Sequence, residues 1–279
     1  MISVLILTLN EEVNIADCLE SVAWADDVLV LDSGSTDRTV EIAEEKGART
    51  MHRPFDDFAS QRNYGLEEGN LQHDWVLHLD ADERVTPALR DVLQTKARHA
   101  AMRAYRVPSK LMFQDTWLKY SGMYPTYQVR FGQKDALTFT QVGHGQRSAL
   151  PADRIGTLDD PLLHYAFSKG IADWVERHNR YSTDEAEHAL EASRDAIDWG
   201  ALVGEDPQAR RRALKALSYH LPFRPLLRFL YVYVGCLGFL DGRAGFDYAV
   251  LLSFYEYMIG LKRRERKRTS GPGPRRERE

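Results

Sequence analysis

A chain of 279 residues, 43% hydrophobic and 28% charged, has a globular composition, which excludes wholesale disorder. The net charge of −4 conceals an asymmetry, because nine Lys/Arg against three Glu give residues 262–279 a charge of +6 and leave −10 for the rest. An acidic body argues against nucleic-acid binding. The two cysteines, Cys18 and Cys236, lie far apart, which predicts reduced thiols in a cytosolic protein.

The first hundred residues alternate apolar runs with helical patterns. Residues 2–8 follow Met1 without the basic start or cleavage site of a signal peptide, and they are too short to span a bilayer, so we expect a buried strand. Continuous Val/Ile/Leu runs predict a parallel sheet covered by helices on both faces. Thr86-Pro87 predicts a helix start. The expected strands are 2–8, 27–32, 48–52 and 74–80, and the expected helices 11–23, 36–46, 57–68 and 87–99.

The pattern changes after about residue 103. Dense aromatics, glycines and prolines through residue 168 predict short strands and long loops, on the acceptor side of a cleft. Residues 269–279 combine charges with Pro and Gly, so we expect them to be disordered. The expected helices of the second half are 171–193, 206–220, 225–240 and 246–261.

Two apolar segments in this half, 226–240 and 249–261, are too short or too charged to span a bilayer. The basic run Lys262–Arg268 follows the second segment directly. This order predicts helices that lie in a membrane interface. The alternative is that the apolar faces pack on the first domain or on a second subunit, and that the basic run is merely solvated.

Polar clusters follow three of the expected strands: Thr8–Glu12, Asp32–Asp37 and Asp80–Glu83. In open α/β sheets, ligands bind outside the carboxyl ends of the strands. Asp80 and Asp82 are two residues apart on extended chain, so they can converge on one divalent cation, although a polar turn is the alternative. An acid at Asp32, after an apolar strand, suits a base imino group or a ribose hydroxyl.

Neither common phosphate-binding glycine motif is present in the sequence: there is no G-x-G-x-x-G after the first strand and no G-x-x-x-x-G-K-[ST]. A diphosphate would therefore need a metal to neutralise it. Magnesium in such sites is held by one or two carboxylates together with substrate phosphates. The sequence predicts a metal–diphosphate site for a nucleotide.

Four motifs resemble, in order and at similar spacing, those of inverting family 2 glycosyltransferases with the GT-A fold, and more narrowly the bacterial lipopolysaccharide-core glucosyltransferase branch. They are Thr8–Glu12, Asp32–Asp37, Gln61–Asn63 and Leu79–Glu83. A weaker resemblance extends through about residue 180, at Tyr124-Pro125, Arg130-Phe131, Val142–Arg147 and Leu162–Tyr165.

The resemblance implies a mostly parallel central sheet flanked by helices in a catalytic domain over residues 1–168. Its nucleotide-sugar half would cover 1–100 and its acceptor-side half 101–168, and a helical, membrane-associating extension would cover 169–268.

The resemblance also implies roles for single residues. Thr8 and Asp32 would hold the base, and Glu11 would lie on the ribose side. Asp82 would ligate Mg²⁺ or Mn²⁺ bridging the diphosphate, which stabilises the departing nucleoside diphosphate. The other implied nucleotide-sugar contacts are Asn10, Ser35, Arg62 and Asp80, the last at the ribose or donor sugar.

Two further residues have open alternatives. His164 follows an apolar pair, and it is either a half-buried structural histidine or a metal or diphosphate contact. Arg130 is either a diphosphate or acceptor contact or a solvated strand residue, and we expect the second.

An inverting transfer to a hydroxyl needs a general base. The related enzymes carry a His-Glu pair where this chain has His144 followed by Gly145, so the assignment of the base is open. His144 has a suitable ordinary pKa and flexible glycine neighbours. Asp115 is the weaker candidate.

These observations predict a metal-dependent inverting glycosyltransferase that moves a sugar from a nucleotide-sugar, expected to be UDP-linked, to a lipid-linked glycan. We expect it to be peripheral on the inner face of the cytoplasmic membrane. The enzyme rivals are a polyprenyl-phosphate sugar synthase, whose phosphate acceptor hardly needs a base, and a nucleotidyltransferase, whose glycine- and lysine-rich loop is absent. A non-catalytic nucleotide-sugar-binding or scaffold protein is the rival of another class.

Overall fold

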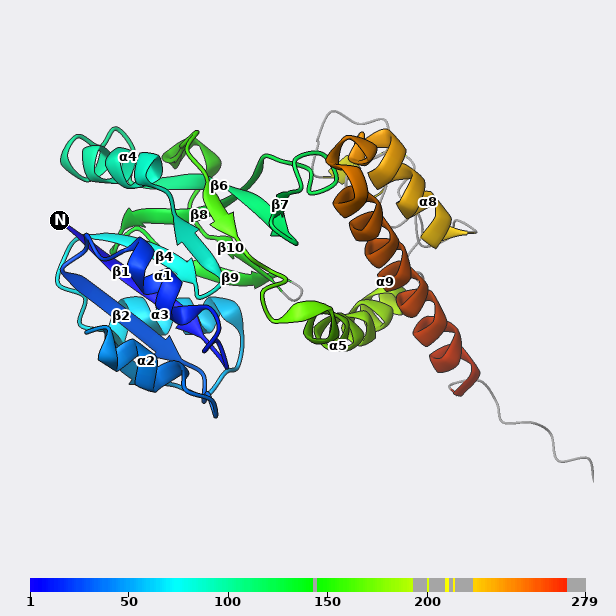
Figure 1. Cartoon of the computed structure of the whole chain (residues 1–279), viewed down its shortest axis with the longest axis horizontal. Coiled ribbons are helices and arrows are strands. Elements are labelled where there is room, and N and C mark those ends of the chain that lie inside the picture. Colours follow the sequence, from blue (N-terminus) through cyan, green and yellow to red (C-terminus); the bar gives the residue numbers. More distant parts are fainter. Residues whose placement is uncertain (143–144, 193–199, 201–208, 211–212, 214–222, 270–279) are drawn as a thin grey trace, which may run out of the picture. The chain divides into compact units, whose positions relative to one another are not determined.

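The computed structural model describes residues 1–142, 145–192, 200, 209–210, 213 and 223–269 (Figure 1). The chain divides into two compact units, Met1–Gly170 and Ile171–Glu279. The sequence predicted a boundary between residues 168 and 169.

The first unit is built on a sheet whose first part is parallel, as the Val/Ile/Leu runs predicted. Its strand order is β3-β2-β1-β4, and the register pairs Thr8 with Asp32 and Leu7 with Asp80. The carboxyl ends of the three inner strands therefore meet at one edge. The four strands of this parallel part are β1 (Ile2–Thr8), β2 (Asp27–Asp32), β3 (Arg49–His52) and β4 (Trp75–Asp80), of which β3 lies at the edge.

Beyond β4 the same sheet becomes mixed. Strand β8 (Thr126–Gln133) is antiparallel to β4, and β6 (Ala104–Phe113) is antiparallel to β8. Strand β12 (Leu162–His164) runs parallel to β6 and pairs antiparallel with β5 (Glu83–Val85), so His164 lies opposite Glu83. The smaller strands are β7 (Thr116–Trp117) and β11 (Ile155–Thr157) on β6, and the hairpin β9 (Phe139–Val142) with β10 (Gly145–Ser148).

Helices cover both faces of the parallel part, which confirms the predicted α/β class. Alternate residues of the strands face opposite ways, so Val4 and Ile6 pack with α1, α2 and α4, whereas Leu5 packs with α3. Thr86 caps α4 through the N–H of Leu89, as predicted. The helices are α1 (Ile15–Ser21), α2 (Thr39–Glu45), α3 (Phe58–Glu68) and α4 (Pro87–Arg98).

Helices α1 and α2 begin three or four residues later than predicted. Residues 11–14 form a turn in which the N–H groups of Asn14 and Ile15 both donate to the Glu11 carbonyl. Residues 36–38 are likewise outside α2, because the N–H of Thr36 donates to Asn10 Oδ1. Short polar side chains compete with helical hydrogen bonds in this way, and the propensity pattern does not register it.

The second unit is helical where it is described. Helix α5 (Gly170–Ala192) precedes α8 (Arg224–Leu230), a π turn (Tyr231–Gly235), a 3₁₀ turn (Gly238–Asp241) and α9 (Gly242–Thr269). The predicted helix at 206–220 lies outside the described residues except at 209, 210 and 213, as does the predicted tail from 270 onward.

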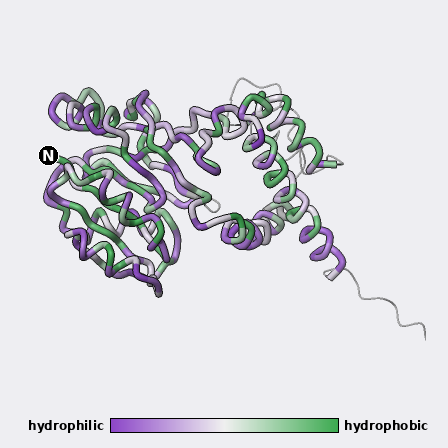
Figure 2. The backbone as a smooth tube through the Cα atoms, viewed as in Figure 1, coloured by the Kyte–Doolittle hydropathy of each residue, from purple (hydrophilic) through white to green (hydrophobic). Residues whose placement is uncertain are grey.

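One helix over residues 225–240 was predicted, and this is wrong. Leu237 has a φ of 62°, which a helix cannot continue through. The π turn and α9 pack on each other through Val232, Ala249 and Leu252, and Arg224 Nε of α8 lies 2.8 Å from Glu256 Oε2 of α9. Figure 2 shows hydrophobic residues along both helices and a hydrophilic C-terminal end of α9.

No single helix among the described residues is long and apolar enough to cross a bilayer. The stretches Arg224–Gly235 and Gly238–Thr269, which are bent by 72° relative to each other, meet that test of length and composition only as a pair.

Candidate functional site

The loops after β1 and β2 are tied together by hydrogen bonds between side chains and backbone. Asn10 has a φ of 54°; its N–H donates to Ser35 Oγ at 2.8 Å, and its Oδ1 accepts the N–H of Thr36 at 2.8 Å. The N–H of Glu11 donates to Thr39 Oγ1 at 2.7 Å. The first two motifs therefore form one connected edge, and Asn10 and Ser35 hold each other there.

Asp32 and Thr8 lie side by side at this edge, as their register requires. Asp32 Oδ2 accepts the N–H groups of Gly34 and Ser35, each at 2.8 Å, and Gly34 has the positive φ of 103° that favours glycine. The Oγ1 of Thr8 is buried without a hydrogen-bond partner. Such a group is one that a bound ligand could satisfy. Contact of either residue with a base stays a prediction.

Asp80, at the end of β4, is held by two arginines. Arg62 Nη2 lies 2.5 Å from Asp80 Oδ1, Arg130 Nη2 lies 2.6 Å from Asp80 Oδ2, and the same Arg130 nitrogen lies 2.6 Å from Glu83 Oε1. Arg62, Arg130 and Glu83 are at most 3% exposed. Burial raises the pKa of Asp80, but the two guanidinium groups outweigh it and hold the pKa below its ordinary value, so this carboxylate is ionised.

The sequence analysis made predictions for both arginines of this cluster. Arg130 was expected to be a solvated strand residue, and this is wrong, because β8 turns its guanidinium inward onto Asp80 and Glu83. Arg62 was expected to contact a nucleotide; its side chain is nearly fully buried on Asp80, and the nucleotide contact stays a prediction.

Asp82 and His164 come together from distant parts of the sequence. Asp82 Oδ2 lies 3.3 Å from His164 Nε2, and the N–H of Tyr165 donates to the Asp82 carbonyl at 2.8 Å. Burial lowers the pKa of His164, but the Asp82 carboxylate outweighs it and raises the pKa to about 9. The pairing of β12 with β5 produces this approach, because it sets His164 opposite Glu83.

This pair fits a divalent cation in part. A carboxylate oxygen and an imidazole nitrogen are both donors that Mn²⁺ accepts, provided that the imidazole first loses its proton. Among the described residues, no group of three or more His, Cys, Asp or Glu side chains is arranged to hold a metal ion. The remaining ligands would have to come from bound phosphates or water.

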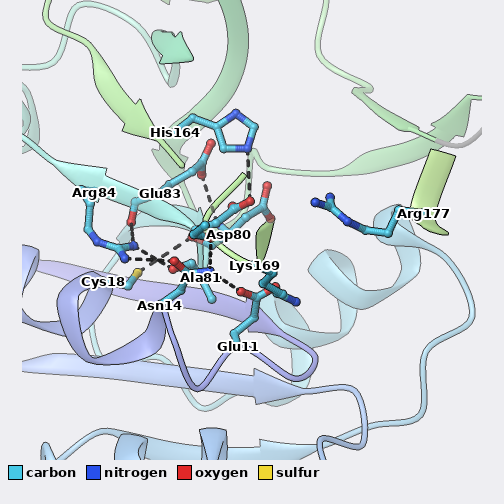
Figure 3. A network of polar contacts seen from close by, with 12 residues as sticks. Glu11, Asn14, Cys18, Asp80, Ala81, Glu83, Arg84, His164, Lys169 and Arg177 are labelled. Carbon is cyan, nitrogen blue, oxygen red and sulfur yellow. Dashed lines mark hydrogen bonds and ion pairs between the residues drawn. The ribbon is translucent and has the colours of Figure 1, made fainter. Parts of the chain in front are cut away.

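A lysine that the sequence analysis missed lies beside this site (Figure 3). Lys169 Nζ lies 2.5 Å from Glu11 Oε1, and Asn14 Nδ2 donates to Glu11 Oε2 at 2.6 Å and to Ser168 Oγ at 2.7 Å. Burial raises the pKa of Glu11. Segment 164–169 is therefore fastened to the loop after β1. No spacing rule connects residues 11 and 169, so the sequence offered no signal for this contact.

Of the two candidate bases, His144 and Asp115, the structure describes only Asp115. His144 lies outside the described residues. Asp115 is exposed in the turn between β6 and β7, with a φ of 61°. Phe113, two residues earlier, packs against Phe167 with ring centroids 4.5 Å apart. The Asp115 turn is thus next to the segment that carries His164, and its role as a base stays a prediction.

Comparison with known proteins adds the following. The model of the family described as glycosyl transferase family 2 matches residues 3–148. An uncharacterized glycosyltransferase from Rickettsia bellii is 30% identical over 202 residues, which cover 68% of this chain and 67% of that protein. The lipopolysaccharide core biosynthesis glycosyltransferase LpsC from Rhizobium meliloti is 25% identical over 278 residues, which cover 90% and 89%.

Solved structures that are similar include glucosyl-3-phosphoglycerate synthase from Mycobacterium tuberculosis in complex with Mn²⁺, uridine diphosphate and glucosyl-3-phosphoglycerate. That protein is 20% identical, with a TM-score of 0.45, and the match covers 59% of this chain and 72% of that one.

We predict that Asp82→Ala and His164→Ala each weaken Mn²⁺ binding at least about tenfold, because each removes one of the two paired donors. Isothermal titration with Mn²⁺ measures this directly. The matched control is His73→Ala, since His73 Nε2 also pairs with an aspartate, Asp26 Oδ1 at 2.8 Å, near the opposite end of β4. Unchanged affinity in both site variants would remove this pair as a metal site.

Proposed function

Because this chain belongs to glycosyltransferase family 2, we propose that it transfers a sugar from a nucleotide-sugar, first of all a UDP-sugar, to a hydroxyl of a lipid-linked glycan such as a lipopolysaccharide core. The observation that carries the proposal is the single edge where the polar ends of β1, β2 and β4 meet, with Asp82 and His164 paired beside it. The likeness to LpsC over 90% of this chain supports the class of acceptor.

In the proposed reaction the nucleotide lies along this edge. Thr8 and Asp32 would contact the base, Glu11 the ribose side, and Asp80 the ribose or the donor sugar. Asp82 and His164 would hold Mg²⁺ or Mn²⁺ against the diphosphate. When bound, the metal stabilises the negative charge of the departing nucleoside diphosphate.

The acceptor oxygen attacks the anomeric carbon, the bond from that carbon to the diphosphate oxygen breaks, and the hydroxyl proton passes to a base. His144 and Asp115 are the proposed candidates. Gly145 stands where the related enzymes carry a glutamate, and the absence of this acid favours an alternative function that does not need a general base. A polyprenyl-phosphate sugar synthase would use the same donor site with an acceptor that is already ionised.

We predict that one of UDP, GDP and CDP binds in a metal-dependent manner, and we expect UDP. Titration calorimetry of the three nucleotides with and without Mn²⁺ measures this. Asp82→Ala should abolish the metal-dependent part of the affinity, since the metal would lose its protein carboxylate. Absence of binding by all three would contradict the glycosyltransferase proposal and favour a scaffold role.

We further propose that the second unit attaches the protein peripherally to the inner face of the cytoplasmic membrane. Helix α9 exposes an apolar stripe at spacings of three or four residues, and α8 with its π turn exposes another. Exposed apolar patches of this kind commonly mark interaction sites. The stripes consist of Phe246, Val250, Phe254, Tyr257 and Leu261, each 38–49% exposed, and of Phe223, Leu226, Leu227, Leu230, Tyr231 and Val234, each 43–77% exposed.

Charge supports a lipid surface as the partner. The run Lys262–Arg268 continues α9 directly beyond its apolar stripe. Each Lys or Arg near an anionic leaflet contributes about 1 kcal/mol of attraction. Within the second unit, Lys262 contacts Asn179 and Thr183, and Arg266 pairs with Glu187. The other basic side chains of the run would be attracted to an anionic membrane.

We predict that the full-length chain sediments with vesicles containing anionic phosphatidylglycerol and less with neutral vesicles. Replacing Val250, Phe254 and Tyr257 together by serine should release it from both, because the inserted apolar area is lost. Met102→Ser, which alters an apolar side chain of similar exposure (38%) in the first unit, is the control. Equal sedimentation of the triple variant and the wild type would refute membrane attachment through this face.

A further inference from the structure

The carboxylate of Asp80 forms ion pairs with two arginines that come from elements far apart in the sequence. Arg62 comes from α3 and reaches one oxygen at 2.5 Å, and Arg130 comes from β8 and reaches the other at 2.6 Å. One nitrogen of Arg130 also bridges to Glu83 Oε1 at 2.6 Å. We name these four side chains the β4 clamp.

Glu83 closes the turn that carries Asp82. Its second oxygen, Oε2, accepts the N–H of Asp80 at 3.0 Å, while the N–H of Ala81 donates to the Leu7 carbonyl at 3.2 Å. The two ends of the turn, Asp80 and Glu83, are thus joined both directly and through Arg130. Arg130 therefore binds both ends of the turn in which Asp82 stands.

Glu83 also links this bridge to the strand that carries His164. Glu83 is the first residue of β5, and in the register of β5 with β12 it lies opposite His164. Arg130 therefore binds the end of β4 and the start of β5, the two strands that flank Asp82, and β5 in turn pairs with the strand that carries His164.

The clamp is not arranged for stability alone. Arg62 Nε and Nη1 and Arg130 Nη1 are buried without hydrogen-bond partners. Buried donors left unpaired are costly, and buried ion pairs often contribute less than well-packed apolar side chains of similar volume. A cluster selected only to hold the core together would not need this combination. A requirement that the turn between Asp80 and Glu83 keep one geometry explains the cluster better.

We propose that Arg130 is a positioning residue of the donor site, which sets the placement of Asp82 and His164 by bridging Asp80 and Glu83. The proposal rests on the proposed function for its ligand, a metal-bound nucleoside diphosphate. Arginine differs from lysine here in reach, because the nitrogen that bridges the two carboxylates is Nη2, one bond farther along the side chain than the Nζ of a lysine.

The test compares Arg130→Lys with the wild type in two titrations, Mn²⁺ alone and UDP in the presence of Mn²⁺. We expect both affinities to fall at least about tenfold, as for other residues that orient metal ligands. The matched control is Arg49→Lys: Arg49 Nη2 also binds a buried carboxylate, Asp27 Oδ1 at 2.8 Å, but at the amino-terminal edge of the sheet. It should leave both affinities unchanged.

A second variant separates positioning from stability. Arg130→Met combined with Glu83→Gln removes one charge of each sign, so the urea midpoint of unfolding should recover relative to Arg130→Met alone. We expect the affinities for Mn²⁺ and for UDP with Mn²⁺ to stay low in this double variant, because the bridge is still missing. Recovery of affinity together with stability would show that Arg130 only stabilises the fold.

The outcomes remain distinct from those of the proposed function. A wild type that binds no nucleotide contradicts the proposed function, whatever Arg130 does. Equal Mn²⁺ affinity in the wild type and in Arg130→Lys overturns the positioning role, whether or not a nucleotide binds.

Discussion

The edge of the sheet depends on neutralising Asp80, an acid that ends a strand otherwise buried in the core. A carboxylate near the core is costly unless positive charge faces it, and here two nearly buried guanidinium groups supply that charge, one to each oxygen. Arg130 also binds Glu83. The same side chain therefore neutralises Asp80 and holds the turn that carries Asp82. The cost of burying Arg62, Arg130 and Glu83 around the half-buried Asp80 is what fixes this geometry.

The two halves of the sheet contribute different things to the site. The parallel part brings the ends of β1, β2 and β4 together, as parallel strands must. The mixed part adds β12, which reaches the same edge because it pairs with both β6 and the short β5. Segment 164–169 is then fastened by Lys169 and Ser168 to the loop after β1. A histidine more than eighty residues from Asp82 thereby becomes its neighbour.

The second unit follows a different physical principle. The π turn that follows α8 buries one apolar face against α9, at Val232, Ala249 and Leu252, and both α8 and α9 still expose apolar side chains. Glu256, an acid within the apolar stretch of α9, pairs with Arg224 of α8 instead of facing outward alone. A helix apolar on more than one side needs more than one partner.

The sequence by itself determined the α/β class, the four parallel strands β1–β4 to within a residue and the three polar clusters at strand ends, because short segments carry the periodicity of a strand and the polar residues that end it. It also indicated the family, through motifs within the first hundred residues. Only the tertiary structure decided that Arg130 is buried on Asp80 and Glu83, that His164 meets Asp82, and that Lys169 holds Glu11. These contacts join residues separated by 47 to 158 positions, and their pairing follows from strand register, which no local pattern encodes.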